Sequence, residues 1–409
     1  MRPALVDQVK NISSVMVKSP EPTSPDIVIF GAGIAGLWVF NRLCNLGYDT
    51  LLLEKESIGG GQTIASQGII HSGLKFSLAG KVNTLAKSIS AMPDLWRDAL
   101  NGIGDIDLST AKSNTQSQQL LIPSGFFGDL TKLVTQKALG NNVHAIERDD
   151  WPEEIVNSGF KGSLIFMDEP VLDVPSVLRA LSAPHKNKIK KITEQQAANP
   201  FEFLEDNNIQ TKQVIFTSAR SNLIIAQSNH HNQGLETQAR PLLQGMMKNA
   251  PFPLYAHLVG KTDKPLVSIT THHTKDGSLV WYLGGGAAER KKEADPNDVY
   301  QAALKAFKKY LPNIDFSNVE WATLPIDRIE GKSKTDGWMP DTPTIHRADK
   351  ALYCWPTKLT FAPMLADMVL KDLQKQDIKP SNRSSDFSFL PDVKYADTPW
   401  DKAQWTKLN

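Results

Sequence analysis

Residues 26–36 read Asp-Ile-Val-Ile-Phe-Gly-Ala-Gly-Ile-Ala-Gly, a short apolar run that leads directly into three glycines. The run predicts a strand that is buried on both faces of a parallel sheet. Beyond the glycines, apolar residues recur at helical spacing from Leu37 to Cys44, and Gly47 predicts the end of that helix. Residues 51–54, Leu-Leu-Leu-Glu, form a second buried strand. The order strand, glycine turn, helix, strand predicts a nucleotide-binding unit in an α/β sheet.

The three glycines form a G-x-G-x-x-G pattern, in which each has its own role. Gly31 permits a tight turn, Gly33 lets backbone N–H groups approach a pyrophosphate, and Gly36 allows the helix to pack closely on the strand. The free N–H groups at the helix start attract an anion. Glu54 would accept hydrogen bonds from the ribose hydroxyls of an adenosine, and its position disfavours a 2′-phosphate. The predicted dinucleotide site contains Gly31, Gly33, Ile34, Ala35, Gly36 and Glu54.

The composition narrows the class of protein. Lysine plus arginine (45) nearly balances aspartate plus glutamate (44), which argues against a general nucleic-acid binder. No apolar run approaches the ~20 residues of a membrane-spanning helix. The two cysteines, Cys44 and Cys354, are too few for a disulfide framework or a four-cysteine metal site. We therefore expect a soluble cytoplasmic protein with no nucleic-acid partner and no transmembrane segment. Peripheral contact with the inner membrane remains open.

The 409 residues correspond to two or three domains at about 150 residues each. Apolar periodicity predicts helices over 92–100, 130–139, 174–181, 296–310 and 361–373, and strands over 213–217, 266–270, 279–283 and 351–355. The region 238–283 is rich in β-branched and aromatic residues with turn signals at 261–264 and 275–277, which predicts antiparallel strands. A discontinuous domain interrupted by a second one explains this order. We expect a leader at 1–25, a nucleotide-binding domain made of 26–95, 145–225 and 325–378, a substrate or cap domain made of 96–144 and 226–324, and a tail at 379–409.

Residues 59–73 form a long stretch of small residues directly after Glu54, and this stretch contains Ile69, Ile70 and His71. A flexible linker would be solvated and would not carry these residues, whereas a backbone held close to a flat ring calls for glycines and small hydroxyls. Together with the glycine motif, residues 66–74 (Ser-Gln-Gly-Ile-Ile-His-Ser-Gly-Leu) resemble the D-amino-acid-oxidase-like superfamily of FAD-dependent oxidoreductases. The resemblance looks closest to the 2-hydroxyglutarate dehydrogenase and glycerol-3-phosphate dehydrogenase branches.

Two segments near the C-terminus resemble the same superfamily. Residues 336–343 resemble its loop before the last flavin-binding strand, and residues 357–360 resemble the Gly-Gly-Lys-Leu-Thr string of glycerol-3-phosphate dehydrogenases. The chain departs from the pattern at 355–357, where Trp-Pro-Thr replaces the glycines, and at 218–220, where Ser-Ala-Arg replaces an Ala-Gly pair. The resemblance implies a Rossmann-like α/β domain that binds FAD non-covalently, capped by an antiparallel β-sheet. It adds to the cofactor contacts Lys55, Gly61, Gln62, Thr63, Ser66, Gln67, Gly68, Ile70, Thr357, Lys358, Leu359 and Thr360.

Three side chains are candidates for the chemistry beside the flavin. His71 lies in the segment expected to pass the ring, and an imidazole can take up a proton near neutral pH. A covalent link to the flavin and a purely structural role remain alternatives for His71. Arg240 and Arg328 could hold a carboxylate or phosphate bidentately. The alternatives are a surface position for Arg240, and a salt bridge with Asp327 or Glu330 for Arg328.

Other polar groups are weaker candidates. The resemblance implies that Lys358 lies near the flavin, where positive charge stabilises the reduced ring. We interpret His257 as a hydrogen-bonded strand histidine. No metal is expected at the pairs 230–231 and 272–273, because neighbours on a strand point to opposite faces and no cysteine or acidic cluster completes a ligand set. The aromatic-rich tail from Lys379 either lies across the protein surface or docks on a partner or a membrane.

These observations predict an FAD-dependent oxidoreductase, a dehydrogenase rather than an oxidase. The substrate would be a small anion, a 2-hydroxy acid or a compound like glycerol 3-phosphate, which transfers a hydride to flavin N5. The electrons would pass to a quinone or another carrier. The alternatives are an amine or amino-acid oxidase of the same fold and a non-catalytic flavin-binding module.

Overall fold

The computed structural model describes residues 22–72, 90–125, 143–260, 265–286, 289–291, 293–331, 342–356 and 358–408. Some of the predicted features lie outside the described residues. They are most of the leader, the helix over 130–139, the turn over 261–264, most of the loop over 336–343, Gly73, Leu74 and Thr357.

The predicted nucleotide-binding unit is confirmed. Strand β1 (Ile27–Phe30) leads through the glycines to helix α1 (Ile34–Asn45), which returns to strand β2 (Thr50–Glu54). The two strands pair in parallel from Ile27 opposite Thr50 to Phe30 opposite Leu53. The chain therefore delivers the glycine turn and the end of β2 to the same edge of a sheet.

A six-stranded sheet is built around β1. Its order is β16 (Thr344–Ala348), β17 (Ala351–Trp355), β9 (Gln213–Phe216), β1, β2 and β8 (Ile189–Lys191). Five of these strands run parallel, and only the edge strand β16 is antiparallel to its neighbour. Most of the strand residues are buried, as the uninterrupted apolar runs of the sequence predicted.

Helices cover both faces of the six-stranded sheet. Ile27 and Ile29 belong to a core with residues of α1, α7 (Val174–Ser182) and α12 (Ala362–Lys375). The alternate residues Val28 and Phe30 belong to a separate core with α9 (Pro200–Asp206) and α10 (Arg220–Ser228), and α8 (Glu194–Ala198) adjoins them. Because successive strand residues point to opposite faces, one apolar run supplies both cores.

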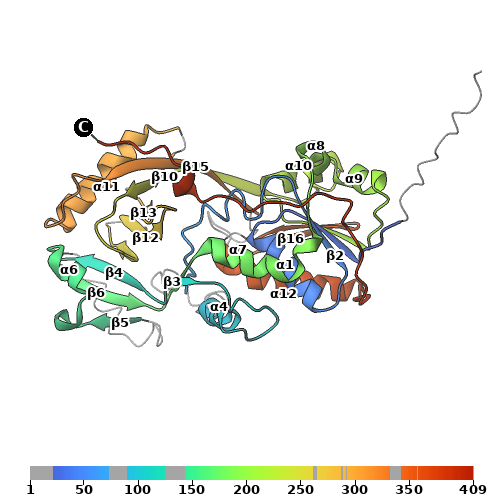
Figure 1. Cartoon of the computed structure of the whole chain (residues 1–409), viewed down its shortest axis with the longest axis horizontal. Helices are drawn as coiled ribbons and strands as arrows, with labels where there is room; N and C mark the ends of the chain where they lie inside the picture. The colour runs from blue at the N-terminus through green and yellow to red at the C-terminus, as the bar shows by residue number, and fades with distance from the viewer. Residues whose placement is uncertain are drawn as a thin grey trace, which may run out of the picture.

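A nine-stranded sheet forms the other end of the molecule (Figure 1). Its order is β14 (Glu289–Arg290), β10 (Thr237–Lys248), β13 (Leu279–Gly284), β12 (Val267–His273), β11 (Ala256–Leu258), β4 (Gln118–Pro123), β6 (Gly162–Met167) and β5 (Val143–Ile146), with β15 (Glu320–Gly331) paired to β10. The sheet is antiparallel as predicted, except that β11 and β4 run parallel. β3 (Ser113–Thr115) and β7 (Val171–Leu172) form a separate pair.

The membership of the sheets differs from the expected division at residue 145. Strands β5 and β6 pair in the nine-stranded sheet, although the sequence placed residues 145–225 with the nucleotide-binding part. The pairing of β6 with β4 joins segments about 40 residues apart in the sequence, and no local sequence pattern predicts such a pairing. The chain crosses to the six-stranded sheet only after Met167, through β7 and α7.

The two faces of the nine-stranded sheet differ in polarity. One face packs under α11 (Pro296–Tyr310) through Leu243, Ile269, Trp281 and other apolar residues. Polar side chains are buried elsewhere on its strands. Those that alternate with apolar neighbours include Ser268, Thr270 and His272 on β12, and Gln118, Gln244 and His257 are buried on β4, β10 and β11. The six-stranded sheet has no comparable series on its described strands.

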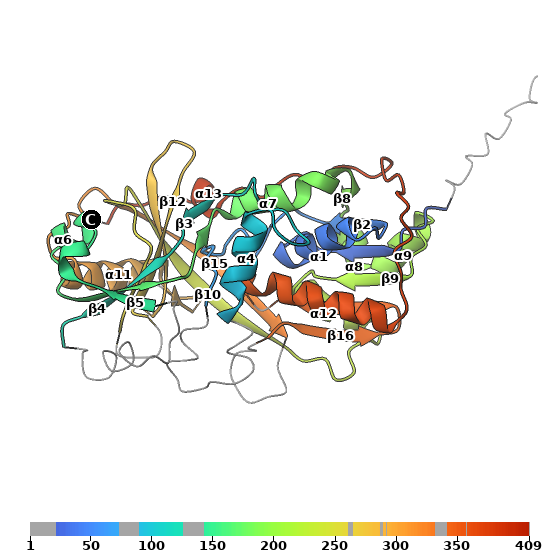
Figure 2. The ribbon, with the colours of Figure 1, turned by 90° about the horizontal axis from the view of Figure 1, so that it is seen from below.

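The C-terminal tail lies along the protein itself. It forms single bridges from Asp392 to Lys190, from Tyr395 to Ile58 and from Thr406 to Trp321, and so spans both sheets (Figure 2). Trp400, in the short helix α13 (Pro399–Lys402), is buried. The remaining helical elements are α4 (Met92–Leu100), α6 (Glu153–Asn157) and 3-10 turns over Arg148–Asp150, Ala183–Lys188 and Leu359–Phe361. Within the described residues, no helix has both the length and the apolar character needed to cross a bilayer.

Candidate active site

The glycine turn is closed by contacts within the chain. The Cβ of any other residue at Gly36 would lie 1.9 Å from the carbonyl oxygen of Gly31, which is itself in the left-handed region at φ +106°. Helix and strand therefore approach each other as closely as the glycine pattern predicted. At Gly33 the nearest atom to such a Cβ is the Thr63 hydroxyl, at 3.2 Å. The Ile34 N–H donates to this same hydroxyl over 3.0 Å, which places Thr63 at the start of α1.

Glu54 lies at the end of β2, beside the glycine turn. One of its carboxylate oxygens accepts a hydrogen bond from the Ala32 N–H at 2.7 Å, and the other accepts one from the Glu56 N–H at 2.7 Å. Burial raises the pKa of Glu54, and these backbone donors partly oppose that effect. The two backbone donors hold the carboxylate beside the glycine turn. Its neighbour Lys55 instead pairs with Glu194 at 2.8 Å on the surface.

The segment from Gly61 to Ser72 runs between the two sheets. The Gln62 side-chain oxygen accepts a hydrogen bond from the Ile329 N–H at 3.2 Å, and the Gln67 amide donates to the Tyr282 carbonyl at 2.9 Å. The Tyr282 hydroxyl in turn donates to the Ala65 carbonyl at 2.8 Å. Strands β13 and β15 of the nine-stranded sheet therefore fix this segment against the nucleotide-binding unit.

Two residues of this segment bear on its fit to a flavin. The Ser66 hydroxyl is buried and has no hydrogen-bond partner among the residues described, so it can serve a bound polar group. A contact within the chain also requires a glycine at position 68. At φ +75° its Cβ would lie 2.3 Å from the Leu172 carbonyl oxygen, so that the protein backbone of β7 requires a glycine there.

His71 joins the N-terminal and C-terminal motifs. Its backbone N–H donates to the Thr360 hydroxyl at 3.2 Å, and that hydroxyl donates to the Ile69 carbonyl oxygen at 3.3 Å. Thr360 is buried, whereas Leu359 and Lys358 are half-buried on the same turn. The ammonium group of Lys358 lies 5.7 Å from the centre of the Phe361 ring. Segments nearly 300 residues apart in the sequence therefore meet at His71.

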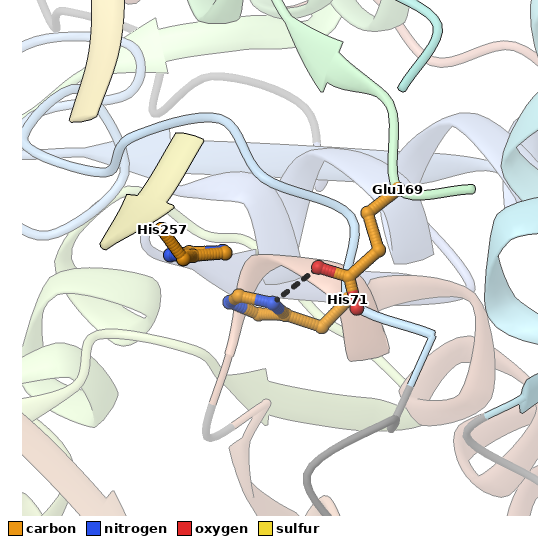
Figure 3. Close-up of side chains that lie close together, drawn as sticks. All are labelled: His71, Glu169 and His257. Atoms are coloured by element: carbon orange, nitrogen blue, oxygen red, sulfur yellow. Dashed lines mark hydrogen bonds and ion pairs between the residues drawn. The ribbon is translucent and has the colours of Figure 1, made fainter. Parts of the chain in front are cut away.

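Sequence reasoning missed the carboxylate that contacts His71. Glu169, between β6 and β7, is buried, and its Oε2 lies 3.1 Å from His71 Nδ1 (Figure 3). On the other side of His71, the ring of His257 is roughly parallel to that of His71 with a centroid separation of 6.4 Å. His257 is buried on β11 with its Nδ1 2.7 Å from the Ser268 hydroxyl, which confirms the prediction of a hydrogen-bonded strand histidine. No motif surrounds Glu169 or His257 in the sequence, so no sequence pattern predicts that they contact His71.

Among the described residues, His71, Glu169 and His257 are one group that could be considered for a metal ion. One ligand atom from each residue lies within 4.8 Å of the other two. A metal ion there would compete with the hydrogen bonds that the Glu169 carboxylate already accepts from Ser72 and Gln118.

Arg240 and Arg328 lie directly opposite each other on β10 and β15. The guanidinium group of Arg240 binds the buried carboxylate of Glu330, with 3.2 Å between Nε and Oε2 and a second contact from Nη2 to Oε1. The structure therefore gives Arg240 an ion pair with Glu330. Asp327 pairs with Arg220 at 3.4 Å. The side chain of Arg240 remains 28% exposed, so it is not enclosed by this ion pair.

Comparisons with known proteins agree with this architecture. The sequence profile of the family described as FAD dependent oxidoreductase (DAO) matches residues 26–354. The chain is 35% identical to the probable FAD-dependent oxidoreductase PA4991 of Pseudomonas aeruginosa over 395 residues, which cover 94% of this chain and 99% of the relative. The crystal structure of that relative has a TM-score of 0.77 and 31% identity, covering 93% of this chain and 99% of the other.

Two more distant solved structures share the fold. L-α-glycerophosphate oxidase of Mycoplasma pneumoniae, solved with FAD bound, has a TM-score of 0.58 and 13% identity, with 91% of this chain and 98% of the other covered. Glycine oxidase of Geobacillus kaustophilus has a TM-score of 0.55 and 15% identity, with 92% and 100% covered. At these identities the likeness shows the fold alone.

Proposed function

The chain belongs to the DAO family of FAD-dependent oxidoreductases, and we propose that it oxidises a small anionic substrate, a 2-hydroxy acid or a compound like glycerol 3-phosphate. FAD is its cofactor. When bound, FAD supplies the acceptor for the two electrons and the hydrogen of the substrate C–H bond. We propose that a quinone or another carrier then accepts the electrons from the reduced FAD.

The residues near the glycine turn fit FAD. The structure leaves no room for a Cβ at Gly31 or Gly36, the N-terminus of α1 suits a pyrophosphate, and Glu54 suits a ribose. The buried Ser66 hydroxyl, which has no partner among the described residues, offers a donor for the flavin end. We propose that the FAD is bound without a covalent link to His71, because Glu169 and Thr360 already fix the ring and backbone of this residue.

The observation that carries the proposal is the position of His71. It lies where the two segments that resemble flavin-binding motifs meet, and it faces the buried polar residue His257 of the nine-stranded sheet. Its side chain is 33% exposed, so a small molecule can reach it. We propose that His71 accepts the proton of the substrate hydroxyl while the adjacent carbon is oxidised.

The preference for an anion rests on the pair Arg240 and Arg328. These two cations stand opposite each other on one face of the β10–β15 ladder, and the carboxylate of Glu330 binds Arg240. The Arg240 guanidinium remains partly exposed beside this ion pair. A substrate carboxylate or phosphate could bind its exposed N–H groups.

The test is the anaerobic bleaching of the flavin absorbance of the purified holoenzyme. The compounds would be 2-hydroxyglutarate, lactate, malate, glycerol 3-phosphate, sarcosine and several amino acids, with glycerol as the uncharged counterpart of glycerol 3-phosphate. We expect a hydroxy acid or glycerol 3-phosphate to bleach the flavin rapidly and glycerol not to. In H71N the bleaching rate should fall by roughly 10²–10⁴, which is the usual contribution of a general base.

The matched control is H230N, because His230 is exposed in the turn after α10 and Asn tolerates its φ of +58°. Its bleaching rate should equal that of the wild type. Bleaching by amines alone would replace the proposal with an amine or amino-acid oxidase, and a flavin that no compound reduces would favour a binding module. Acid precipitation gives a separate answer on the link to His71, since non-covalent FAD passes wholly into the supernatant.

A further inference from the structure

A short stretch of backbone pairing determines which residue contacts His71. The Ile70 N–H donates to the Pro170 carbonyl at 2.9 Å, and the Leu172 N–H donates to the Gly68 carbonyl at 2.9 Å. Ile69 and Val171 form the bridge between these bonds. Because the two segments run antiparallel, each step forward from Ile70 is matched by a step back from Pro170. Glu169 therefore lies beside His71 and Ser72.

The Glu169 carboxylate is surrounded by hydrogen-bond donors. Its Oε1 accepts the Ser72 N–H and the Ser72 hydroxyl, both at 2.9 Å. Its Oε2 accepts the Gln118 amide at 3.3 Å and contacts His71 Nδ1 at 3.1 Å. Burial alone would raise the pKa of Glu169, but the charge and hydrogen bond of His71, followed by His257 and Ser72, lower it to about 2. The group is therefore an ionised carboxylate at neutral pH, and it can only accept hydrogen bonds.

The tautomer of His71 follows from this geometry. Since ionised Glu169 has no proton to give, His71 Nδ1 must carry the proton of their hydrogen bond. In the neutral imidazole, Nε2 is then the nitrogen without a proton, and it carries the basic lone pair. Among the residues that the structure describes, the titratable groups Glu169, from the β6–β7 connection, and His257, from β11, lie close to His71. The cation Lys358 lies on the same turn as Thr360, whose hydroxyl accepts a hydrogen bond from the backbone N–H of His71.

We propose that Glu169 is a positioning residue, which holds His71 in the Nδ1–H tautomer so that Nε2 is the atom that accepts the substrate proton. This inference rests on the proposed function. In the proton transfer, the substrate O–H bond breaks and an Nε2–H bond forms, and the resulting imidazolium is stabilised by the Glu169 carboxylate. The transfer needs no co-reactant beyond the FAD of the proposed function.

The substitution E169Q should reverse the tautomer without unfolding the site. The Ser72 N–H is a fixed donor, so the Gln oxygen must take the place of Oε1 and its NH₂ group must take the place of Oε2. That NH₂ group would donate to His71 Nδ1 and leave the proton on Nε2. Gln118 can adapt by turning its amide, because its Oε1 is buried without a hydrogen-bond partner among the described residues. The amide that E169Q introduces therefore keeps hydrogen-bond partners in Ser72, His71 and Gln118, while the basic lone pair at Nε2 of His71 is lost.

The first measurement is the tautomer itself, recorded by ¹⁵N NMR of histidine-labelled holoenzyme without substrate, with H71N to assign the signal. We expect the Nδ1–H form in the wild type and in E169D, and the Nε2–H form in E169Q. An unchanged tautomer in E169Q overturns the proposal. This readout needs no substrate, so it stands or falls separately from the proposed function, which fails if no compound of the panel bleaches the flavin.

The second measurement is the rate of anaerobic bleaching between pH 5 and 9. E169Q should lose at least about 100-fold in the rate at every pH, with little change in KM, because the accepting atom is lost rather than the substrate contacts. E169D keeps the charge and should recover part of the rate. The control is D372N, which removes a partly buried carboxylate of α12 that pairs with Arg347 and should leave the rate unchanged. A wild-type rate in E169Q would overturn the proposal.

Discussion

The six-stranded sheet is apolar on both faces, whereas the nine-stranded sheet is apolar on one and polar on parts of the other. In the first, Ile29 packs on one side and its neighbour Phe30 packs on the other, each under its own helices. In the second, Ile269 belongs to the core under α11, while its neighbours Ser268 and Thr270 lie at hydrogen-bond distance from His257 and Gln67. The same alternation of side chains thus builds two different surfaces.

This difference separates two kinds of recognition. A sheet covered by helices on both faces leaves only the ends of its strands for a ligand, and the glycine turn and Glu54 lie at such an end. A sheet with a polar face can line a cavity along its length. We infer that cofactor contacts come mainly from the first sheet and substrate contacts from the second. His71 and Glu169 lie on the connections between them.

The largest expected effect would break the glycine turn of the six-stranded sheet. In G36A the new Cβ would lie 1.9 Å from the Gly31 carbonyl oxygen, so that helix and strand cannot keep their approach. We expect purified G36A to contain no FAD, as judged by its absorbance near 450 nm. The control G286A, after β13, meets only an ordinary contact of 3.7 Å and should bind FAD as the wild type does. A yellow G36A would show that the turn tolerates a side chain.

A second prediction concerns the acid stability of the polar face. Burial, followed by the charge of His273, lowers the pKa of His272 to about 3, so the folded protein keeps this ring neutral. The unfolded chain binds the proton near pH 6.5. The free energy of unfolding should therefore fall as the pH drops from about 6.5 towards 3, with a slope of up to about 1.4 kcal/mol per pH unit from this group.

This slope can be measured by urea unfolding between pH 6.5 and 4.5. The titration of Glu169 lies at lower pH and does not contribute to the slope in this range. H272Q should show a shallower decline than the wild type, because the titrating group is gone. H273Q serves as the control, since His273 is exposed on the same strand and should leave the decline nearly unchanged. Equal slopes in H272Q and the wild type would mean that His272 is protonated in the folded protein.

The smallest expected effect concerns Ala219, which precedes α10. Ala219 has φ +48° and ψ −104°, a conformation that a Cβ disfavours. A219G should stabilise the protein by about 1 kcal/mol in urea unfolding, after the greater flexibility of glycine in the unfolded chain is subtracted. N249G, at φ +58° after β10, provides the comparison in the nine-stranded sheet. Asn tolerates that region, so N249G should gain less, and an equal gain would argue against strain at Ala219.

Much of the first sheet could be predicted because its signals are local. The strand, glycine turn and helix over 26–45 are encoded by adjacent residues, and the acid at the end of the next strand follows within ten more. Helix α11 and strand β17 also have the bounds that their periodicity predicted. In each case the residues that determine the element lie within one or two turns or one strand of each other.

The neighbours of His71 could not be predicted, because they come from pairing between distant segments. His71 and Glu169 are 98 residues apart, and the register of residues 68–70 against 170–172 brings them together. The sequence alone determined the cofactor motif and identified His71 as a candidate. Only the tertiary structure decided that Glu169 and His257 flank it, since a strand's partner and register depend on the burial of whole faces rather than on residues near the site.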